Sequence, residues 1–284
     1  LPAVPSSVSY TPGDKLPNPF ASDSVKFTIT GANMAQYDQY LTDGYRALLS
    51  TYPSYKMDVY PTRRSCAFPD SVYAATRSNA GIGTLVGGGN GVGKAIMGFP
   101  FPIPNNALEI IWNHTLRFRS FKLTRQFAAA AVTRSGDYTI QTVQDEAILR
   151  WSDPSKTAAE ELNNISLYYI ANTVAPARSA YANFITPLHI NQDVVRYELA
   201  RTWRVEATLK AGNRHVYGRR VKTINEDNWS ISSSDMYDAR GELWRVQELQ
   251  QLQRYQVPLC GTAAEVVYDL QAGRYLALAM TNEE

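Results

Sequence analysis

Cysteine and histidine are scarce in this sequence, and their spacing excludes the usual metal sites. The 284 residues include two cysteines, Cys66 and Cys260, and three histidines, His114, His189 and His215. A structural zinc site needs such residues in closely spaced pairs, and none of these five has a neighbour of that kind. We therefore expect no metal and no cofactor. The two cysteines form either one disulfide or two buried free thiols.

The sequence also lacks a charge imbalance and a long apolar run. Lys and Arg total 28 against 26 Asp and Glu, without blocks of like charge, so the electrostatic basis for binding nucleic acid is missing. The apolar stretches are too short and interrupted to span a bilayer. The chain begins at Leu1 without a basic segment followed by an apolar one, so a signal peptide is either absent or already removed.

Catalytic motifs are missing as well. Residues 88–94 have the glycine and lysine spacing of a phosphate-binding loop, but Ala95 replaces the required hydroxyl, and the prolines at 100 and 102 stop any following helix. We predict that residues 87–94 are a mobile connector that binds no nucleotide. No nucleophile elbow, paired metal-binding histidines or glycosidase carboxylate pair is visible, so we do not predict an enzyme. A hydrolase whose site forms only on folding ranks third among the possible functions.

The sequence is rich in aromatic residues and favours a β-sheet. Hydrophobic residues make up 44% of the chain and aromatic residues 11%, including 18 Tyr and 5 Trp, while charged residues make up 19%. A chain of 284 residues is long enough for one large β domain or two ordinary ones. We predict a single domain over residues 1–284.

Helices are predicted mainly in the first half of the chain. Prolines in residues 1–29 favour an extended arm over the surface. Apolar residues at three- and four-residue spacing predict a helix over residues 30–52 that is capped by Thr30. A short helix is expected over residues 69–79, with proline in its first turn, and an amphipathic helix over residues 105–118.

Strands dominate the rest of the chain. Residues 121–134 and 138–149 flank a Ser-Gly-Asp turn and predict a hairpin. Residues 165–174 are apolar on both faces, as in a strand that is covered on two sides. Residues 197–209 alternate between apolar and polar side chains, and regularly spaced turns after them predict a meander of six antiparallel strands.

Aromatic and arginine side chains are the candidates for ligand contacts, and each has a purely structural alternative. The aromatic candidates line a cavity or simply fill the core: Phe99, Phe101, Trp112, Trp203, Trp229 and Trp244. The arginines near the sheet bind a ligand anion or, as we favour, pair with carboxylates: Arg63, Arg64, Arg201, Arg219 and Arg220.

Five stretches of the sequence resemble a proteobacterial periplasmic family. They are residues 229–238 (WSISSSDMYD), 240–246 (RGELWRV), 268–278 (YDLQAGRYLAL), 60–65 (YPTRRS) and 99–104 (FPFPIP). The family is catalogued as a domain of unknown function and is labelled outer-membrane lipoprotein-sorting-like. The resemblance runs in patches over nearly the whole chain.

The resemblance implies a fold, a compartment and a kind of ligand. The periplasmic lipoprotein carriers, to which this family is considered related, have an incomplete antiparallel barrel closed by helices around an apolar cavity. Family members also tend to accompany exporter-type membrane proteins, which implies handling of hydrophobic molecules on the way to the outer membrane. In a periplasmic protein we expect Cys66 and Cys260 to form a disulfide.

This sequence departs from the family pattern in two places. Family members begin with a signal peptide and a longer arm. They also carry a stretch rich in Tyr and Asp between strands like 165–174 and 197–209, where this chain has only residues 177–193. The abrupt join near Ala180 and Tyr181 indicates that residues are absent there.

We therefore expect an α+β domain built on a large, curved antiparallel sheet, an incomplete barrel, with the helices at 30–52 and 105–118 on its concave face. The predicted function is binding and carrying of a hydrophobic or lipid-like molecule in the periplasm. An interaction module that docks on an outer-membrane or exporter partner is the alternative. Trp203 and Tyr197 are expected on the apolar face of their strand, with Arg201 unpaired nearby to hold an anionic head group.

Overall fold

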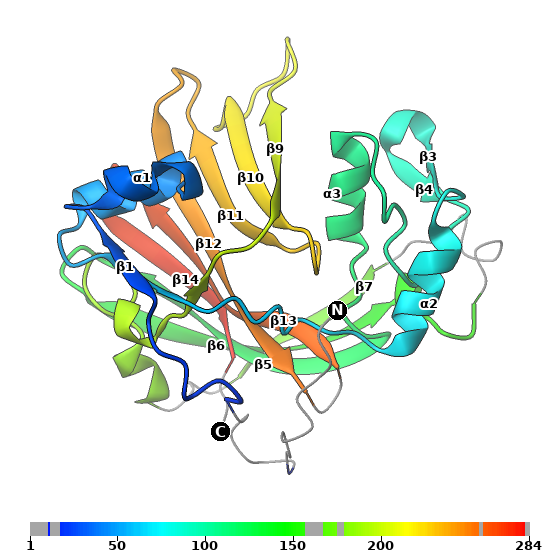
Figure 1. The fold of residues 1–284 in the computed structure, drawn as a ribbon, viewed down its shortest axis with the longest axis horizontal. Helices are drawn as coiled ribbons and strands as arrows, with labels where there is room; N and C mark the ends of the chain where they lie inside the picture. The colour runs from blue at the N-terminus through cyan, green and yellow to red at the C-terminus, as the bar shows by residue number, and fades with distance from the viewer. Residues whose placement is uncertain (1–10, 12–17, 157–166, 175–178, 256–257, 282–284) are drawn as a thin grey trace.

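A nine-stranded antiparallel sheet dominates the fold. The computed structural model describes residue 11 and residues 18–156, 167–174, 179–255 and 258–281. The strand order is β7-β6-β5-β14-β13-β12-β11-β10-β9 (Figure 1). The strands are β5 (Lys122–Val132), β6 (Tyr138–Leu149), β7 (Leu167–Val174), β9 (Thr202–Thr208), β10 (Arg219–Asn225), β11 (Ile231–Tyr237), β12 (Leu243–Arg254), β13 (Leu259–Asp269) and β14 (Arg274–Met280).

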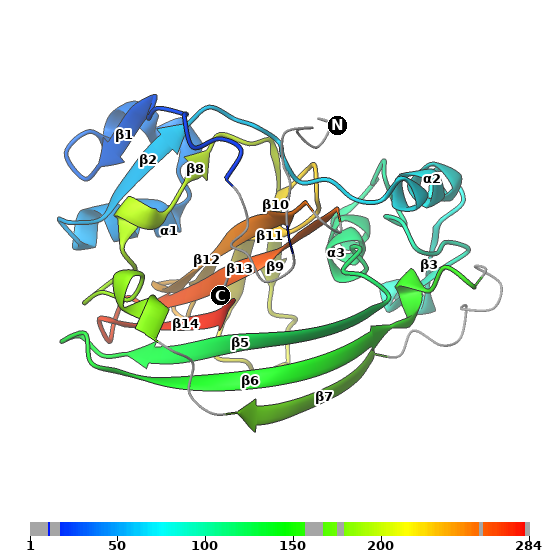
Figure 2. The same ribbon diagram turned by 90° about the horizontal axis from the view of Figure 1, so that it is seen from below.

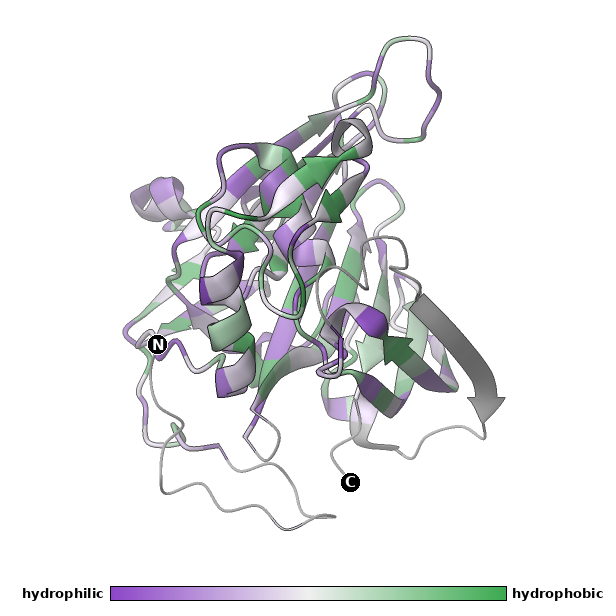
Figure 3. Ribbon diagram, turned by 90° about the vertical axis from the view of Figure 1, so that its right-hand side faces the viewer, coloured by the Kyte–Doolittle hydropathy of each residue, from purple (hydrophilic) through white to green (hydrophobic). Residues whose placement is uncertain are grey.

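The sheet is curved but not closed. In the described part of the chain its edge strands β7 and β9 do not pair with each other, so the sheet is an incomplete barrel. Hydrophobic and hydrophilic residues alternate along the strands (Figure 3), as expected when successive side chains point to opposite faces. The predicted α+β class with a large, curved antiparallel sheet is confirmed.

The hairpin of β5 and β6 forms where the sequence predicted it. The N–H of Thr133 donates to the carbonyl of Asp137 at 2.9 Å, and Gly136 takes a φ of 93° that favours glycine. Strands β9 to β14 then follow one another as the predicted six-strand meander, each pairing antiparallel with the next.

One predicted strand is broken in two. Residues 197–209 form β8 (Tyr197–Glu198) and β9, which starts only at Thr202. Strand β8 leaves the large sheet and pairs parallel with β2 (Lys56–Tyr60). The guanidinium of Arg196 donates to the carbonyl of Pro61 at 2.8 Å, which holds this segment beside β2. The local alternation of residues could not reveal this distant contact.

The expected helix over residues 30–52 is wrong in its first half. Residues Phe27–Thr30 form strand β1, which pairs with β2, and a 3-10 turn, η1 (Met34–Tyr40), follows. Asn33 ends the strand because its side chain accepts from the N–H of Thr30 at 2.7 Å. The true helix α1 (Asp43–Thr51) begins after Thr42, whose hydroxyl accepts from the N–H of Tyr45 at 3.3 Å. Most of the predicted arm over residues 1–29 lies outside the described residues.

The other predicted helices are confirmed with shorter bounds. They are α2 (Asp70–Asn79), which follows Pro69, and α3 (Ala107–Thr115), which Asn106 caps by accepting from the N–H of Glu109 at 3.1 Å. Figure 2 shows α1 with β1, β2 and β8 at one end of the trough formed by β5 and β6, and α2 and α3 at the other end. The remaining short elements are η3 (Arg150–Ser152), η4 (Ser179–Asn183) and η5 (Gln192–Val194).

The glycine-rich stretch is a small hairpin and not the simple connector that we predicted. Strands β3 (Thr84–Val86) and β4 (Gly91–Gly93) pair antiparallel around the turn η2 (Gly87–Gly89). The indole N–H of Trp112 donates to the carbonyl of Gly89 at 3.0 Å and fixes this turn against α3. No helix follows Lys94 until α3, as the prolines predicted, so this segment lacks the architecture of a phosphate-binding loop.

Among the residues that the structure describes, the core consists of three apolar clusters. The largest joins α1, β1 and β2 to the sheet through buried residues such as Leu48, Val59 and Val246. The second contains Phe68, Phe99, Ile110, Val205 and Trp229, and the third contains Val92, Phe101, Leu116 and Trp151.

Among the helices in the described ranges, none is both long enough and apolar enough to cross a membrane.

Candidate ligand cavity

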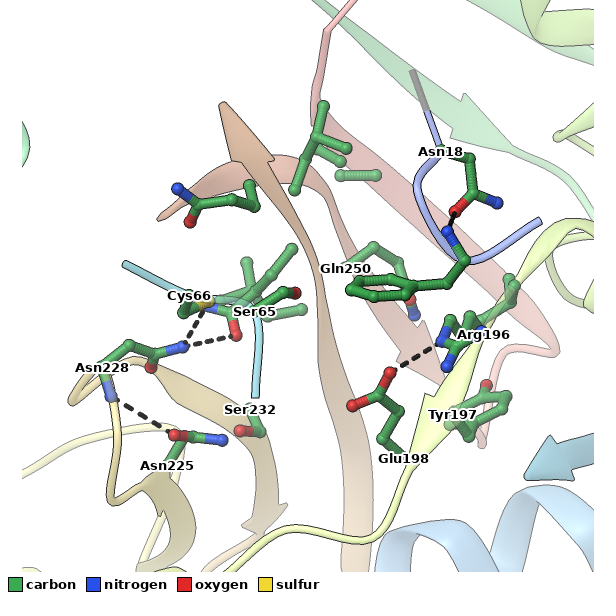
Figure 4. A pocket seen from close by; sticks show the side chains of 18 of the residues that line it. Asn18, Ser65, Cys66, Arg196, Tyr197, Glu198, Asn225, Asn228, Ser232 and Gln250 are labelled. Atoms are coloured by element: carbon green, nitrogen blue, oxygen red, sulfur yellow. Dashed lines mark hydrogen bonds and ion pairs between the residues drawn. The ribbon is translucent and has the colours of Figure 1, made fainter. Parts of the chain in front are cut away.

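A cavity of about 850 Å³ lies at one end of the large sheet and is partly open to solvent. Side chains from β11, β12, β13 and β14 form one wall (Figure 4). Chain segments that cross the end of these strands form the other walls: residues 18–20, 62–66, 181–184, 194–200 and 225–228. Segments from almost the whole length of the chain therefore meet at this one place.

The lining of the cavity is both apolar and polar. The larger apolar side chains are Phe20, Tyr45, Tyr181, Phe184, Val195, Tyr197, Leu249, Leu252, Tyr255 and Met280. The neutral polar ones are Asn18, Thr62, Ser65, Asn183, Asn225, Asn228, Ser232, Gln250, Gln251, Gln253 and Thr281. This combination suits a molecule that has an apolar part to bury and polar groups that need hydrogen-bond partners.

A strap of the chain at residues 18–23 is held over the cavity by charged groups. The carboxylate of Asp23 pairs with Arg63 and, at 2.7 Å, with Arg196, and its side chain is only 4% exposed. Hydrogen bonding from Arg63 holds the pKa of Asp23 at about 2, below its usual 3.8. Both guanidiniums also lie over the ring of Phe20, at 5.2 and 5.8 Å from its centre. The strap is thus clamped between two arginines.

Two further ion pairs fix the segments around the opening. Arg196 pairs with Glu198 at 2.7 Å, and the second carboxylate oxygen of Glu198 accepts from the backbone N–H of Arg63 at 2.9 Å. Arg64 pairs with Asp227, with its Nε donating at 2.9 Å, and so ties residues 62–66 to the turn after β10.

Cys66 and Cys260 form a disulfide, with their Cα atoms 5.0 Å apart, as the family resemblance implied. The side-chain amide of Asn228 donates to Sγ of Cys66 at 3.0 Å and to Oε1 of Gln251 at 3.1 Å. Figure 4 shows Cys66 and Asn228 side by side in the cavity wall. The disulfide therefore fastens the link over residues 62–66 to β13.

A buried carboxyl group lies directly behind the cavity wall. Glu248 on β12 is completely buried and contacts the hydroxyls of Tyr268 at 2.7 Å, Tyr55 at 3.1 Å and Tyr197 at 3.3 Å. Burial raises the pKa of Glu248 above its usual value. Tyr197 also donates to Oε1 of Gln192 at 2.8 Å, so this one side chain connects the cavity to the buried network.

The residues predicted to contact a ligand do not gather in this cavity. Within the described chain, Tyr197 is the only one of the eight that lines it. The expected unpaired guanidinium of Arg201 is wrong, since Arg201 pairs with Glu226 at 3.1 Å and is 88% exposed. Trp203 lies on the edge strand β9, where it is 37% exposed and stacks on Trp229.

The remaining predicted aromatics lie in three other places. Phe99 and Trp229 pack together in the second apolar cluster, with ring centres 6.1 Å apart. Phe101 belongs to the third cluster, and Trp112 packs against it. Trp244 donates its indole N–H to Asp269 at 3.2 Å. Their roles as ligand contacts stay predictions.

The favoured interpretation of the five arginines as structural is confirmed for the four that form ion pairs. Arg63 pairs with Asp23, Arg64 with Asp227 and Arg201 with Glu226, and Arg219 lies 3.6 Å from Glu206. Arg220 lies over the ring of Tyr217 instead, at 5.6 Å from its centre.

Neither the strap nor Glu248 was predicted from the sequence. Glu248 follows Val246 by two residues in the meander, and an acidic residue on a buried face is the one local signal that could have found it. Nothing local marks Asp23 or Phe20, because their partners lie far away along the chain.

A serine and a histidine meet beside a second cavity, of about 410 Å³. Nδ1 of His189 donates to the carbonyl of Ile190 at 2.7 Å, so Nε2 accepts from the hydroxyl of Ser54 at 2.8 Å. Burial lowers the pKa of His189, which weakens His189 as a base.

Where the structure describes the chain, no three His, Cys, Asp or Glu side chains gather to hold a metal ion.

Comparison with known proteins places the chain in a family. Residues 28–182 and 179–284 match the family described as "Protein of unknown function (DUF1329)". Uncharacterized protein PA3922 of Pseudomonas aeruginosa is 33% identical over 362 residues, which cover 95% of this chain and 78% of that protein. The alignment is longer than this chain, and the two family matches meet at residues 179–182, where the abrupt join occurs.

Three solved structures are similar at lower identity. An outer membrane lipoprotein-sorting protein domain from Vibrio parahaemolyticus is 11% identical, with a TM-score of 0.38 over 62% of this chain and 92% of that chain. A DUF1329 family protein from Desulfovibrio piger is 13% identical, with a TM-score of 0.36 over 61% and 87%. LolA superfamily protein NE2245 from Nitrosomonas europaea is 13% identical, with a TM-score of 0.35 over 62% and 91%. By its matches to the family and to PA3922, this chain belongs to the DUF1329 family.

Proposed function

We propose that this protein binds and carries an amphiphilic molecule, such as a fatty acid or lipid, in the cavity at the end of the sheet. The observation that carries the proposal is the cavity itself, since about 850 Å³ lies within the range of sites that enclose small organic ligands. Its lining combines aromatic and aliphatic side chains with uncharged polar groups and with two ion pairs, Arg64–Asp227 and Arg196–Glu198. No step of chemistry is required for this function.

The walls suggest how such a ligand would be held. Burial of an acyl chain against Leu249, Leu252 and Met280 would contribute about 0.8 kcal/mol per methylene group. The hydroxyl and amide side chains of Ser232, Gln251 and Asn225 offer hydrogen bonds to a polar head. The position of Tyr197 in the cavity lining supports its predicted role as a ligand contact, whereas the ion pair of Arg201 with Glu226 argues against such a role for Arg201.

The proposed compartment is the periplasm, with delivery toward the outer membrane. The Cys66–Cys260 disulfide supports an oxidising compartment, because such bonds persist outside the cytosol. The sequence resemblance to periplasmic carrier-like proteins supports the same location. Contact with an outer-membrane or exporter protein is part of this proposal.

The alternative is an interaction module that carries no ligand and docks on an outer-membrane or exporter partner. One observation favours it. The edge strand β9 leaves one side of its backbone unpaired within the described chain, and Trp203 and Leu209 are 37% and 39% exposed beside it. An exposed edge strand with apolar side chains is a template for adding a partner's strand.

Native mass spectrometry of protein purified gently from its source tests the proposal. A carrier should show a fraction with added mass, and organic extraction should release a molecule of that mass. A protein that has only its own mass, and that gains none after incubation with a lipid extract of the source membranes, would contradict the proposal and favour the interaction module.

A further inference from the structure

A group of basic side chains lies between the end of α3 and the large sheet. Arg117 and Arg119 follow α3 in the chain, and Lys222 comes from β10. Figure 1 shows α3 beside the edge strand β9, which is the neighbour of β10 in the sheet. In the part of the chain that the structure describes, none of these three cations has a carboxylate oxygen within 4.0 Å. They differ in this from the paired arginines around the cavity.

Arg117 is held by main-chain and ring contacts only. Its Nη1 donates to the carbonyl of His114 at 2.8 Å and lies 3.4 Å from Nδ1 of the His114 ring. That Nδ1 lies 2.9 Å from the carbonyl oxygen of Trp229 and 3.3 Å from the backbone nitrogen of Ile231. Burial lowers the pKa of His114 to about 3, so this ring stays neutral and adds no charge. The pKa of Arg117 falls to about 9 for the same reason, and its guanidinium remains positive at neutral pH.

The sheet supplies the other side of the group. Lys222 is the cross-strand partner of Ser234, and Ser234 is the partner of Gln247, so the three side chains share one face. They point away from Glu248, which is the next residue after Gln247 on β12. Ser234 is 1% exposed, and its hydroxyl has no hydrogen-bond partner.

Two buried polar atoms of this group are unsatisfied. Besides the hydroxyl of Ser234, Nε of Arg119 is buried without a partner, and in the described part of the chain the hydroxyl of Tyr52 is the one other such atom. Leaving a buried donor unpaired is costly, and the cost is larger for a charged group. Two of the three unsatisfied atoms therefore belong to this group, since Arg119 follows Arg117 by two residues and Ser234 is the cross-strand partner of Lys222.

The negative charge nearby is too small to balance the group. Glu265 on β13 is the acidic residue whose charge acts on both Arg117 and Lys222. Its carboxylate already accepts a hydrogen bond from the side-chain amide of Gln247. Farther along the sheet, Arg125 is paired with Asp145 at 2.8 Å. The positive charges of Arg117, Arg119 and Lys222 are therefore opposed by the single negative charge of Glu265.

We propose that Arg117, Arg119, Lys222 and Ser234 form a binding site for an oxyanion, the phosphate group of inorganic phosphate or of a phosphoester. Guanidinium groups match the geometry of phosphate oxygens, and an ammonium and a hydroxyl complete the donor set. Because none of these residues lines the large cavity, the site is separate from the proposed carrier function and does not depend on it.

Calorimetric titration with inorganic phosphate and with glycerol phosphate tests the site. The wild type should bind at least one of them saturably, with an affinity that falls as salt is added. Arg119→Met and Lys222→Met should each weaken binding about tenfold or more. Lys210→Met removes the same charge from an exposed turn and should leave the affinity unchanged.

Thermal unfolding separates binding from a structural role. Phosphate should raise the Tm of the wild type and of Lys210→Met, and it should raise that of Lys222→Met much less. Ser234→Ala leaves every backbone hydrogen bond in place and should also weaken phosphate binding. A rise in Tm with phosphate that is equal in the wild type, Lys222→Met and Ser234→Ala would overturn the proposal.

Vesicles identify the source of the phosphate group. If neither soluble phosphate binds, flotation with phosphatidylglycerol vesicles that fails for Lys222→Met but not for Lys210→Met assigns the site to a lipid head group. The absence of saturable binding to inorganic phosphate, glycerol phosphate and these vesicles alike would overturn the proposal.

Discussion

The hydroxyl of Tyr268 donates a hydrogen bond of 2.7 Å to the carboxyl group of Glu248, and both side chains are completely buried. The hydroxyls of Tyr55 and Tyr197 reach the other carboxyl oxygen. Tyr197 also lines the cavity. The wall of the cavity is therefore supported by a buried polar network and not by apolar packing alone.

Replacing Glu248 should separate the effect of its hydrogen bonds from that of its charge. Glu248→Ala should lower the free energy of unfolding by about 3 kcal/mol or more, because it leaves buried tyrosine hydroxyls without an acceptor. Glu248→Gln keeps an acceptor and should cost much less. Chemical denaturation of the three proteins measures this, and equal losses for Ala and Gln would contradict it.

The difference in stability between the wild type and Glu248→Gln should depend on pH. Burial raises the pKa of Glu248, so the folded protein holds this proton more tightly than the unfolded chain does. The contribution of Glu248 is then fully present below its unfolded pKa of about 4.3, and it is lost as pH rises through the folded pKa. The stability of the wild type relative to Glu248→Gln should fall as pH rises from 4 to 8. A difference that is constant or rises with pH would be inconsistent with the raised pKa.

Asp23→Asn should release the strap over the cavity. The pKa of Asp23 is lowered to about 2, so its contribution to stability is present above pH 4 and is lost as pH falls toward 2. At neutral pH the variant should be cut by trypsin after the exposed Lys26 severalfold faster than the wild type. Asp137→Asn changes a remote turn and serves as the control. If Asp23→Asn and Asp137→Asn were cut at the same rate, the strap would not depend on this carboxylate.

Removal of the disulfide should be strongly destabilising. Cys66 and Cys260 are 194 residues apart, and closing so long a loop contributes about 5 kcal/mol in the chain-entropy model. The double variant Cys66→Ala and Cys260→Ala should lose roughly this much in denaturant unfolding. A thiol assay on unreduced, unfolded wild type should count no free thiols, and a count of two would refute the bond.

The glycine-rich hairpin should not bind nucleotide. Ala95 supplies no hydroxyl for magnesium, and no helix follows Lys94 to meet phosphate groups. Calorimetry with ATP and GTP should show no saturable heat for the wild type. Micromolar binding that disappears in Lys94→Ala would show that this interpretation is wrong.

The features that were predictable from the sequence depend on neighbours in the chain. The hairpin of β5 and β6 and the six-strand meander follow from alternation and turn residues, and α3 follows from its helical spacing. The break between β8 and β9 was not predictable, because Arg196 is held by Asp23, 173 residues away.

The cavity was even less predictable from the sequence than the fold. Tyr55 and Glu248 are 193 residues apart and meet only in the folded chain. Alternation correctly put Trp203 and Val205 on one face, but it could not show that β9 is an edge strand. Val205 is buried there, whereas Trp203 is 37% exposed. Pairing order, and not local pattern, decides which aromatic side chains reach the cavity.

Titration with a fluorescent fatty acid tests the central claim most directly, namely that the cavity binds an amphiphile. The wild type should bind saturably. Ser232→Trp should weaken binding about tenfold or more, because it puts a large side chain into the cavity from β11. Ser78→Trp makes the same change on the exposed surface of α2 and should bind like the wild type. Folding of each variant is checked by circular dichroism. No saturable binding by the wild type across chain lengths, or equal binding by a folded Ser232→Trp, would contradict the account.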